Sequence, residues 1–328
     1  MDIPIKYRML GRSPAFTDCW KSIHKFACHD AAVLICGETG TGKELAARAL
    51  HSLGKRACGP FLPINCGAIP DSLLESEFFG HQKGAFTDAR DPQIGLVEQA
   101  AGGTLFLDEV EALSPRGQTV LLRFLQDYHY RAVGGRMEQV ADVRVVAATN
   151  VELSDLVDRG AFRRDLMYRL KSLVLIVPAL RARGADIGLI ADALLNRWSL
   201  EANAPIKRLS LSASYVLDRH DWPGNIRELE NVLLGGFLAA EDEEITEQHF
   251  GRLIGIGKDG IDNSLQSYQI AKKAAVVTFE QAYLKQLMCM ANGNITKAAQ
   301  LSHQHRTALS KLLKKYGVSP LSSGRGDR

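Results

Sequence analysis

Apolar residues occur in short blocks along this chain, and the blocks alternate in type over residues 1–180. Blocks with strand character lie at 32–36, 61–65, 103–109, 142–150 and 173–177. Stretches with the apolar spacing of helices lie at 13–27, 44–50, 73–79 and 118–128. Alternating strands and helices predict an α/β fold with a parallel sheet. Pro63 favours a sheet edge for its strand, and Asp71 is expected to cap the third helix.

From about residue 185 the pattern predicts helices only. Apolar residues recur at helical spacing over 185–200, 211–219, 225–240 and 246–253. A stretch rich in Gly, Asp and Ser follows at 255–267, and short helices are predicted at 279–290, 295–301 and 306–315. The predicted divisions are an α/β core at 1–180, a helical subdomain at 181–254, a linker at 255–272, a second helical domain at 273–318 and a tail at 319–328.

The loop after the first predicted strand has the sequence of a phosphate-binding site. It reads GETGTGKE, joins a strand to a helix and matches the spacing G-x-x-x-x-G-K. Glycines let backbone N–H groups point at a phosphate, and the helix N-terminus adds partial positive charge. The predicted nucleotide-binding residues here are Gly37, Glu38, Thr39, Gly40, Thr41, Gly42, Lys43 and Glu44. Glu44 replaces the usual Ser or Thr ligand of Mg²⁺, so water or another residue must take the place of that hydroxyl ligand. The alternative to a phosphate-binding loop is a plain glycine-rich surface turn.

Polar residues also end two later strands. Asp108 and Glu109 close the apolar strand at 103–109. In phosphoryl transfer the first acid of such a pair holds Mg²⁺, and the second polarises the attacking water. Thr149 and Asn150 end the next strand, and the carboxyl ends of parallel strands meet ligand at one edge. ATP and Mg²⁺ are therefore the predicted cofactors, although a local capping role explains Thr149 and Asn150 equally well.

Two further segments stand apart in composition. Phe86 and Thr87 lie in a glycine-flanked loop, where the ring either contacts a partner or tucks under a neighbouring helix. The stretch at 162–170, FRRDLMYRL, carries three arginines, including Arg163 and Arg169. These arginines either face solvent or reach the γ-phosphate held by a neighbouring subunit.

The C-terminal block is basic and lacks acids. No Asp or Glu occurs from 281 to 326, whereas Lys and Arg recur. Two short basic helices joined by a tight turn predict a helix-turn-helix that binds double-stranded DNA. A basic tail that binds RNA or an acidic protein is the alternative. The predicted DNA-binding residues are Gln304, His305, Arg306, Thr307, Ser310, Lys311 and Lys314.

Composition narrows the class of protein. The net charge of +3 is too small to indicate a nucleic-acid partner, so only its distribution argues for one. Six cysteines without C-x-x-C spacing are expected to be reduced thiols. With no apolar run long enough to span a membrane and no signal-peptide core, a cytoplasmic protein without membrane contact is expected. We expect no sensory domain before the first helix, so control falls to a regulatory protein in trans, a small molecule or expression level.

Together these motifs closely resemble the bacterial enhancer-binding proteins, the AAA+ activators of sigma-54 RNA polymerase. The resemblance runs from residue 10 to 317 and rests on GETGTGKE (37–44), NCGAI (65–69), ESEFFGHQKGAFT (75–87), GGTLFLDE (102–109), AATN (147–150), FRRDLMYRL (162–170), WPGNIRELEN (222–231) and GNITKAAQ (293–300). It implies a P-loop AAA+ domain, a helical lid and a C-terminal Fis-type helix-turn-helix. It also implies an ATPase that binds an upstream DNA site and remodels the closed complex of the sigma-54 RNA polymerase holoenzyme.

The roles known for that family map onto single residues. By resemblance the catalytic set is Lys43, Asn65, Asp108, Glu109, Arg163 and Arg169. Asn65 corresponds to the switch residue that pairs with Glu109. Thr149 and Asn150 correspond to sensor I, and Arg227 corresponds to sensor II. The resemblance further implies a homo-oligomer, a hexamer when active and a dimer at rest, in which Arg163 and Arg169 reach across the ring.

The chain departs from the family pattern in its surface loop. It reads GAFTDA at 84–89 where the family has GAFTGA. Phe86 and Thr87, the sigma-54 contacts in the family, are kept, whereas Asp88 adds a Cβ and a negative charge. Asp tolerates left-handed backbone better than most residues, so the loop can still form. Two alternatives remain open. One is a related DNA-binding regulator, with ATP as ligand, that represses or acts on another polymerase form, and the other is an AAA+ remodeller of unrelated targets.

Smaller departures lie at 181–186, RARGAD, which loses acids of the family's LRER-x-EDI stretch, and at 303–304, where the family's turn glycine is absent.

Overall fold

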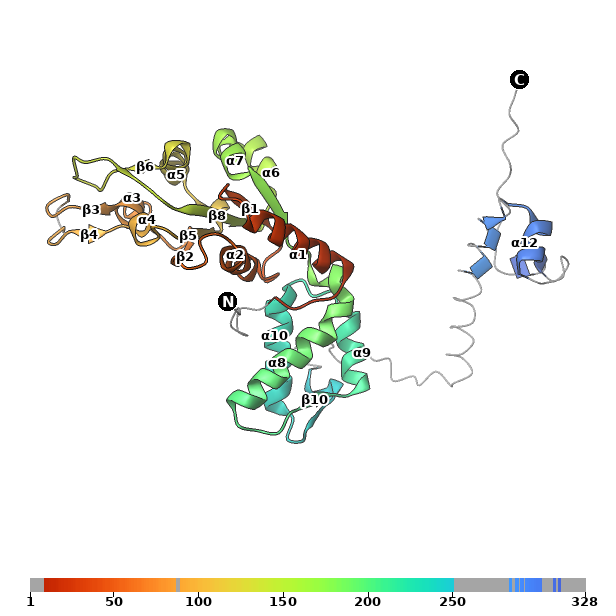
Figure 1. The fold of residues 1–328 in the computed structure, drawn as a ribbon. Coiled ribbons are helices and arrows are strands. Elements are labelled where there is room, and N and C mark those ends of the chain that lie inside the picture. The colour runs from red at the N-terminus through yellow and green to blue at the C-terminus, as the bar shows by residue number, and fades with distance from the viewer. Residues whose placement is uncertain are drawn as a thin grey trace, which may run out of the picture. The chain divides into compact units, whose positions relative to one another are not determined.

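The computed structural model describes residues 9–86 and 89–250 and, in the C-terminal part, 283–284, 287–288, 290–291, 293–302, 309–310 and 312–313. The chain divides into two compact units, residues 1–255 and 256–328. Figure 1 shows that the first unit consists of a sheet with helices on both faces, followed by a bundle around α8–α10. No helix among these described residues is long and apolar enough to cross a membrane.

A five-stranded parallel sheet forms the centre of the first unit, in the order β2-β5-β8-β1-β9. Its strands are β1 (Val33–Cys36), β2 (Phe61–Asn65), β5 (Thr104–Asp108), β8 (Arg144–Thr149) and β9 (Leu173–Ile176). Every residue of β8 and four of the five in β5 are buried, as expected for strands covered on both faces. The predicted parallel sheet is therefore confirmed, and β2 with Pro63 does lie at its edge.

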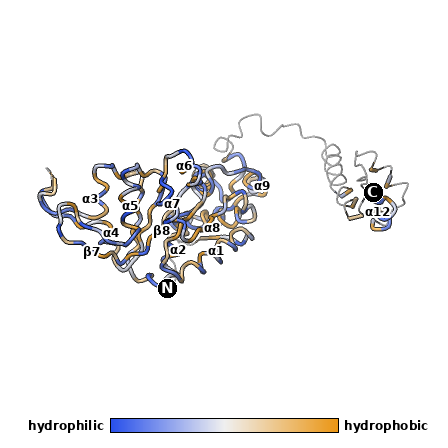
Figure 2. Tube along the Cα trace, turned by 90° about the horizontal axis from the view of Figure 1, so that it is seen from above, coloured by the Kyte–Doolittle hydropathy of each residue, from blue (hydrophilic) through white to orange (hydrophobic). Residues whose placement is uncertain are grey.

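Seven helices among the described residues cover the sheet. They are α1 (Pro14–Ala27), α2 (Lys43–Ser52), α3 (Leu74–Phe79), α4 (Leu96–Gln99), α5 (Pro115–Asp127), α6 (Leu153–Asp158) and α7 (Arg164–Leu170). Because side chains alternate along a strand, Val33 and Ile35 face a core made with α1 and α2, whereas Leu34 faces a core made with α3, α5 and α7. Hydrophobic and hydrophilic residues are interspersed along the covering helices (Figure 2), as expected for helices with one face on the core.

Two helices, α5 and α3, start differently from the predictions. Helix α5 begins three residues earlier than predicted, because the Ser114 hydroxyl accepts from the Gly117 N–H at 3.1 Å and Pro115 fits the first turn. The predicted cap by Asp71 is wrong. Helix α3 starts after Leu73 without a side-chain cap, following a hydrogen-bonded turn from Leu73 N–H to the Pro70 carbonyl.

Two short hairpins extend from the sheet region. They pair β3 (Gly80–His81) with β4 (Gln93–Ile94), and β6 (His129–Tyr130) with β7 (Gln139–Val140). Strands of two residues carry no alternation that the sequence pattern can reveal. Figure 1 places β3 and β4 at the end of the first unit far from α8–α10.

The helical subdomain contains α8 (Ile187–Glu201), α9 (Leu211–Arg219) and α10 (Asn225–Ala239) around buried Trp222 and Phe250. The prediction of helices alone was wrong here. β10 (Arg208–Leu209) pairs in parallel with β11 (Glu244–Ile245). The described part of the predicted helix at 246–253 is a single 3₁₀ turn, η4 (Glu247–His249), closed by a reciprocal cap between Thr246 and His249; residues 251–253 lie outside the described residues.

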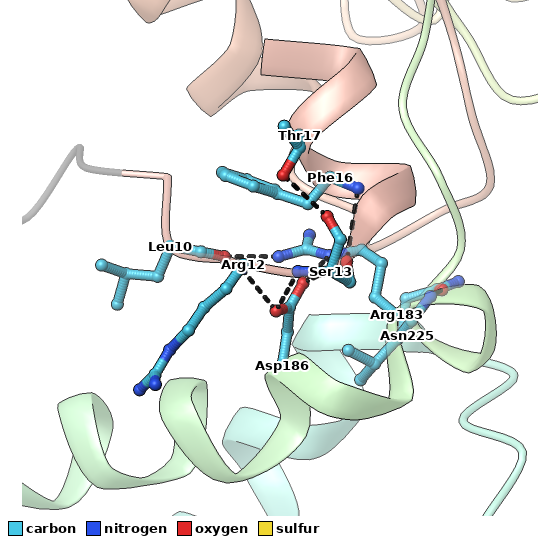
Figure 3. A network of polar contacts seen from close by, with 9 residues as sticks. Leu10, Arg12, Ser13, Phe16, Thr17, Arg183, Asp186 and Asn225 are labelled. Carbon is cyan, nitrogen blue, oxygen red and sulfur yellow. Dashed lines mark hydrogen bonds and ion pairs between the residues drawn. The ribbon is translucent and has the colours of Figure 1, made fainter.

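A buried carboxylate joins the start of the core to the helical subdomain (Figure 3). Asp186, fully buried at the end of η3 (Leu180–Asp186), accepts from the backbone N–H groups of Arg12 at 2.6 Å and Ser13 at 2.9 Å. It also accepts from the Ser13 hydroxyl at 2.7 Å and from Arg183 Nε at 3.1 Å. Arg183 in turn donates to the Leu10 carbonyl and stacks on Phe16. One buried acid thus organises this junction.

The second unit has a small core of its own. Helix α12 (Ile295–Leu301) matches the predicted helix and is capped by Asn294, whose side-chain oxygen accepts from the N–H groups of Thr296 and Lys297. Buried residues of this core are Leu284, Leu287, Met288, Ala291, Ala298, Ala299, Leu309 and Leu313. The helices predicted at 279–290 and 306–315 lie largely outside the described residues.

Candidate nucleotide-binding site

The predicted phosphate loop connects β1 to α2. Gly40 and Gly42 have φ of +78° and +93°, values that favour glycine, and Gly42 caps α2. Lys43 Nζ donates to the carbonyls of Gly37 at 2.8 Å and Glu38 at 3.1 Å, so the lysine lies inside the turn of the loop. A positive side chain and a helix N-terminus therefore meet at one place, which suits an anion.

The acids predicted for the metal and the water lie beside the loop. β2 and β5 pair so that Asn65 and Asp108 are direct neighbours. Glu109 follows in left-handed backbone, φ +55°, which turns it out of the strand. Asn65 Nδ2 donates to Glu109 Oε2 at 3.3 Å, while Asn65 Oδ1 accepts from the Gly67 N–H at 2.8 Å. The contact implied by resemblance, between Asn65 and Glu109, is therefore present.

The charges at this edge of the sheet act on one another. Burial raises the pKa of Asp108, and neighbouring Lys43 opposes that rise only in part. Burial lowers the pKa of Lys43, opposed by Asp108, Glu111 and Glu109 in that order. Glu111 was not predicted as a site residue. It follows Glu109 by two positions and its Oε1 accepts from the Asn150 N–H at 3.2 Å, a contact that no sequence motif announces.

The donor set fits Mg²⁺ only with help from phosphate and water. Among the described residues no group of three or more His, Cys, Asp or Glu is placed to hold a metal by itself. Asp108 offers a carboxylate beside Lys43, and Glu111 Oε2 is buried without a hydrogen-bond partner in the described part of the chain. Because Mg²⁺ keeps several waters and binds through one or two carboxylates plus phosphates, these residues suit it. Glu44 is engaged elsewhere, since its carboxylate accepts from Arg48 at 2.7 and 2.9 Å.

The end of β8 contributes its backbone more than its side chains. Thr149 is buried, and its hydroxyl donates to the Val151 carbonyl at 3.2 Å and accepts from the Val151 N–H at 3.3 Å. Its carbonyl accepts from the Gly37 N–H at 3.3 Å. Thr149 thus closes a local turn and fixes the start of the phosphate loop, while Asn150 is exposed.

The helical subdomain packs directly on the phosphate loop. Asn225 Nδ2 donates to Glu38 Oε2 at 3.1 Å and to the Thr39 carbonyl at 3.0 Å. Arg181 forms a two-point ion pair with Glu38, and this hydrogen bonding, followed by that of Asn225, lowers the pKa of Glu38 to about 2. Sequence reasoning missed Arg181 and Asn225. The sequence signal for Asn225 is an asparagine directly after Gly224 at a predicted helix start. Asparagine tolerates left-handed backbone, and the φ of Asn225 is indeed +53°.

The predicted sensor Arg227 lies at the same contact. A Cβ on Gly40 would approach Arg227 Cβ to 3.1 Å, and the Ile226 N–H donates to the Gly40 carbonyl at 3.0 Å. Arg227 also contributes to lowering the pKa of Lys43. The first turn of α10 therefore forms one wall of the candidate site.

The two predicted ring-spanning arginines are both exposed; Arg163 directly precedes α7, and Arg169 lies in its last turn. Arg163 pairs with Asp165 at 2.8 and 3.1 Å. Arg169, at the other end of α7, lines a pocket of about 370 Å³ together with Asp30, Arg56 and Tyr128. In the described residues neither arginine contacts the phosphate loop of its own chain.

The remaining predicted residues lie at the loop and in the second unit. Phe86 is 39% exposed and rests against His81. Thr87 and Asp88 lie outside the described residues, as do Gln304, His305, Arg306, Thr307, Lys311 and Lys314. Ser310 is described and is exposed on a helical segment.

Comparisons with known proteins identify the family. Residues 9–176 match the Sigma-54 interaction domain, and residues 181–264 match the AAA+ ATPase lid domain. The chain is 41% identical over 326 residues to the response regulator protein PilR of Pseudomonas aeruginosa, covering 97% of this chain and 71% of PilR. It is 40% identical over 325 residues to the regulatory protein AtoC of Escherichia coli strain K12, covering 95% of this chain and 68% of AtoC.

The structure is similar to that of NtrX from Brucella abortus in complex with ATP. The TM-score is 0.70 at 31% identity, covering 95% of this chain and 69% of that chain. The chain belongs to the family that carries the Sigma-54 interaction domain, with an ATP-binding fold of the AAA+ type and an AAA+ lid. The predicted resemblance is confirmed at this level.

Proposed function

We propose that this chain is a transcriptional activator that hydrolyses ATP in a ring and uses it to remodel sigma-54 RNA polymerase at promoters. The observation that carries the proposal is the Asn65–Glu109 hydrogen bond beside Lys43 and Asp108, in a chain whose residues 9–176 match the Sigma-54 interaction domain. A catalytic acid held by an amide next to the phosphate loop can respond to whether a γ-phosphate is present.

The residues of the site divide the chemistry among them. Lys43 and the loop N–H groups bind the phosphates of ATP, and Arg227 reaches them from the lid. Mg²⁺, when bound beside Asp108, neutralises phosphate charge. Glu109 orients the attacking water and accepts its proton, and Asn65 holds Glu109 away from that water until the nucleotide shifts it.

The exposed Arg163 and Arg169, at the two ends of α7, suit action between subunits. A head-to-tail ring contact places one subunit's surface beside the nucleotide of the next. Arg163 would leave Asp165 and, with Arg169, approach the neighbouring γ-phosphate, where an arginine stabilises the charge of the transition state. We propose a hexamer as the active form, with Phe86 and Thr87 contacting sigma-54 and the second unit binding an upstream DNA site.

The test separates binding from chemistry. Glu109→Gln should lower ATP turnover by about 10²- to 10³-fold and leave nucleotide affinity within about threefold, because the carboxylate acts on water rather than on phosphate. Lys43→Ala should abolish nucleotide binding itself. Turnover is measured by phosphate release, affinity with a fluorescent ATP analogue, and promoter opening with purified sigma-54 polymerase. A wild-type chain that hydrolyses ATP but never opens such a promoter contradicts the activator role.

Asp88 sets a further test of the same proposal. If Asp88→Gly and wild type both open promoters at similar ATP turnover, the loop tolerates the carboxylate. If only the glycine variant does so, the chain has lost sigma-54 activation and acts as another kind of regulator.

A further inference from the structure

His81 occupies an enclosed position between α3 and the surface loop. The residue is only 8% exposed, and it follows Gly80 in β3. Its Nδ1 is 3.1 Å from the hydroxyl of Ser76, which is itself buried in α3. Its ring centroid is 4.8 Å from that of Phe86, with the planes inclined by 57°. A buried imidazole therefore contacts the ring of Phe86, a residue that is 39% exposed.

The backbone fixes the base of this loop but not the ring at its centre. Gln82 N–H donates to the Val133 carbonyl at 2.9 Å, and the Gly84 N–H donates to the Ala89 carbonyl at 2.8 Å. Ala89 N–H closes back on the Phe86 carbonyl at 3.0 Å. Within the described residues, the ring contact of Phe86 is with His81. The imidazole thus links the phenyl ring to α3 through Ser76.

Helix α3 and the segment that follows Glu109 contribute to one hydrophobic core. Leu74 and Phe78 of α3 share a core with Val110 and Leu113, which follow Glu109. Asn65, the partner of Glu109, precedes α3 in the chain and orders the turn at Gly67. Glu109 and α3 are therefore linked through one packed core, which is a route by which a shift of Glu109 can reach α3.

We propose that His81 is a positioning residue that carries movement of α3 to Phe86, with Ser76 fixing the orientation of its ring. This inference rests on the function proposed above. Ser76 selects which ring nitrogen is bonded, so the imidazole plane cannot turn freely. The fixed imidazole plane then holds the Phe86 ring in a defined orientation for each position of α3.

The chain offers a matched control in His51. His51 is likewise buried, with Nδ1 2.9 Å from the Thr104 hydroxyl and a ring centroid 5.5 Å from that of Phe61, but it lies on α2 and contacts β5 and β2. His51→Ala removes the same groups as His81→Ala without touching the loop. It therefore reports what loss of a buried histidine does to stability alone.

The experiment measures the environment of the Phe86 ring directly and uses the full-length chain. 4-Fluorophenylalanine is placed at position 86 alone, and its ¹⁹F resonance is compared with ADP and with a non-hydrolysable ATP analogue. ATP turnover and promoter opening by sigma-54 polymerase are measured on the same variants. The variants are His81→Ala, His81→Phe, Ser76→Ala and His51→Ala.

In the wild type the resonance should differ between the two nucleotides, and His81→Ala should abolish that difference. The number of open complexes formed per ATP hydrolysed should fall about tenfold in His81→Ala. It should fall about threefold in Ser76→Ala, which keeps the imidazole, and in His81→Phe, which keeps an aromatic ring against Phe86. Turnover should stay within about twofold throughout, and His51→Ala should keep the wild-type yield per ATP.

A nucleotide-dependent resonance and a normal yield in His81→Ala would overturn the inference and leave the proposed function intact. If wild type hydrolyses no ATP or opens no promoter, the proposed function fails instead, and the resonance still decides whether His81 couples Phe86 to bound nucleotide. If His81→Ala does not fold, judged by circular dichroism, Ser76→Ala and His81→Phe decide in the same way.

Discussion

At the scale of single residues, buried polar groups in this chain connect segments far apart in sequence. Asp186 joins the segment before α1 to the helical subdomain, and its ion pair with Arg183 is buried on both sides, at 0% and 2% exposure. A carboxylate in that setting is stable only because every neighbouring group donates to it. The chain keeps one well-satisfied acid at the junction, so this position should be sensitive to small changes.

Asp186→Asn should lower the free energy of unfolding by about 3 kcal/mol, because it leaves the Arg183 guanidinium buried without its counter-charge. Urea unfolding at neutral pH measures the loss. Asp18→Asn is the control, since Asp18 pairs with Lys21 at the same i,i+3 spacing but in solvent, and it should change stability by less than about 1 kcal/mol.

The pH dependence of the same variant has a definite sign. Burial alone would raise the pKa of Asp186, but the N–H groups of Arg12 and Ser13, the Ser13 hydroxyl and Arg183 together lower it. A carboxyl whose pKa falls on folding stabilises the fold above its unfolded pKa, and this contribution disappears as the pH falls through the folded pKa. The stability gap between wild type and Asp186→Asn should therefore shrink below about pH 4. A gap that stays constant to pH 2 contradicts this account.

At the scale of elements, the decisive contact is between the phosphate loop and α10. A Cβ at Gly40 would lie 2.2 Å from the Gly224 carbonyl oxygen, so the lid backbone occupies the space that any side chain would need. Gly40→Ala should therefore weaken ATP binding by about tenfold or more, because either the loop or the start of α10 must move. Affinity for a fluorescent ATP analogue measures the loss.

Gly160→Ala separates that clash from backbone strain. Gly160 has a similar positive φ of +71°, but nothing lies within 4 Å of its added Cβ. The substitution should cost about 1 kcal/mol of stability and leave nucleotide affinity unchanged. Equal losses of affinity in the two variants contradict a role for close contact with the lid.

The elements also show what the sequence could predict. All five strands of the sheet were predicted because their apolar runs are bounded by turn residues, and Pro63 identified an edge. The hairpins β3–β4 and β6–β7 and the ribbon β10–β11 have two residues per strand, too few for a period. The phosphate loop, Asp108 and Glu109 carry local motifs, whereas the contacts of Arg181, Asn225 and Glu111 arise only when distant segments pack together.

At the scale of the whole molecule, the chain consists of two compact units. The first, residues 1–255, contains the sheet, the helical subdomain and the candidate site, and the second has its own core around Leu287 and Leu309. A unit with a separate hydrophobic core can fold without its neighbour. The proposed division of labour follows this boundary, with ATP hydrolysis in the first unit and DNA binding in the second.

A chain that ends at residue 255 should therefore keep ATP turnover within about twofold at equal subunit concentration, because every residue of the candidate site remains. It should lose affinity for an upstream DNA fragment by about 100-fold or more, together with the steep salt dependence that phosphate contacts produce. Phosphate release and fluorescence anisotropy at several salt concentrations measure the two effects. Lys314→Ala in the full-length chain is the matched control, expected to reduce the salt slope by about one contact while leaving turnover unchanged. If the shortened chain instead loses turnover, the second unit takes part in assembling the ring, and hydrolysis and DNA binding are not divided at this boundary.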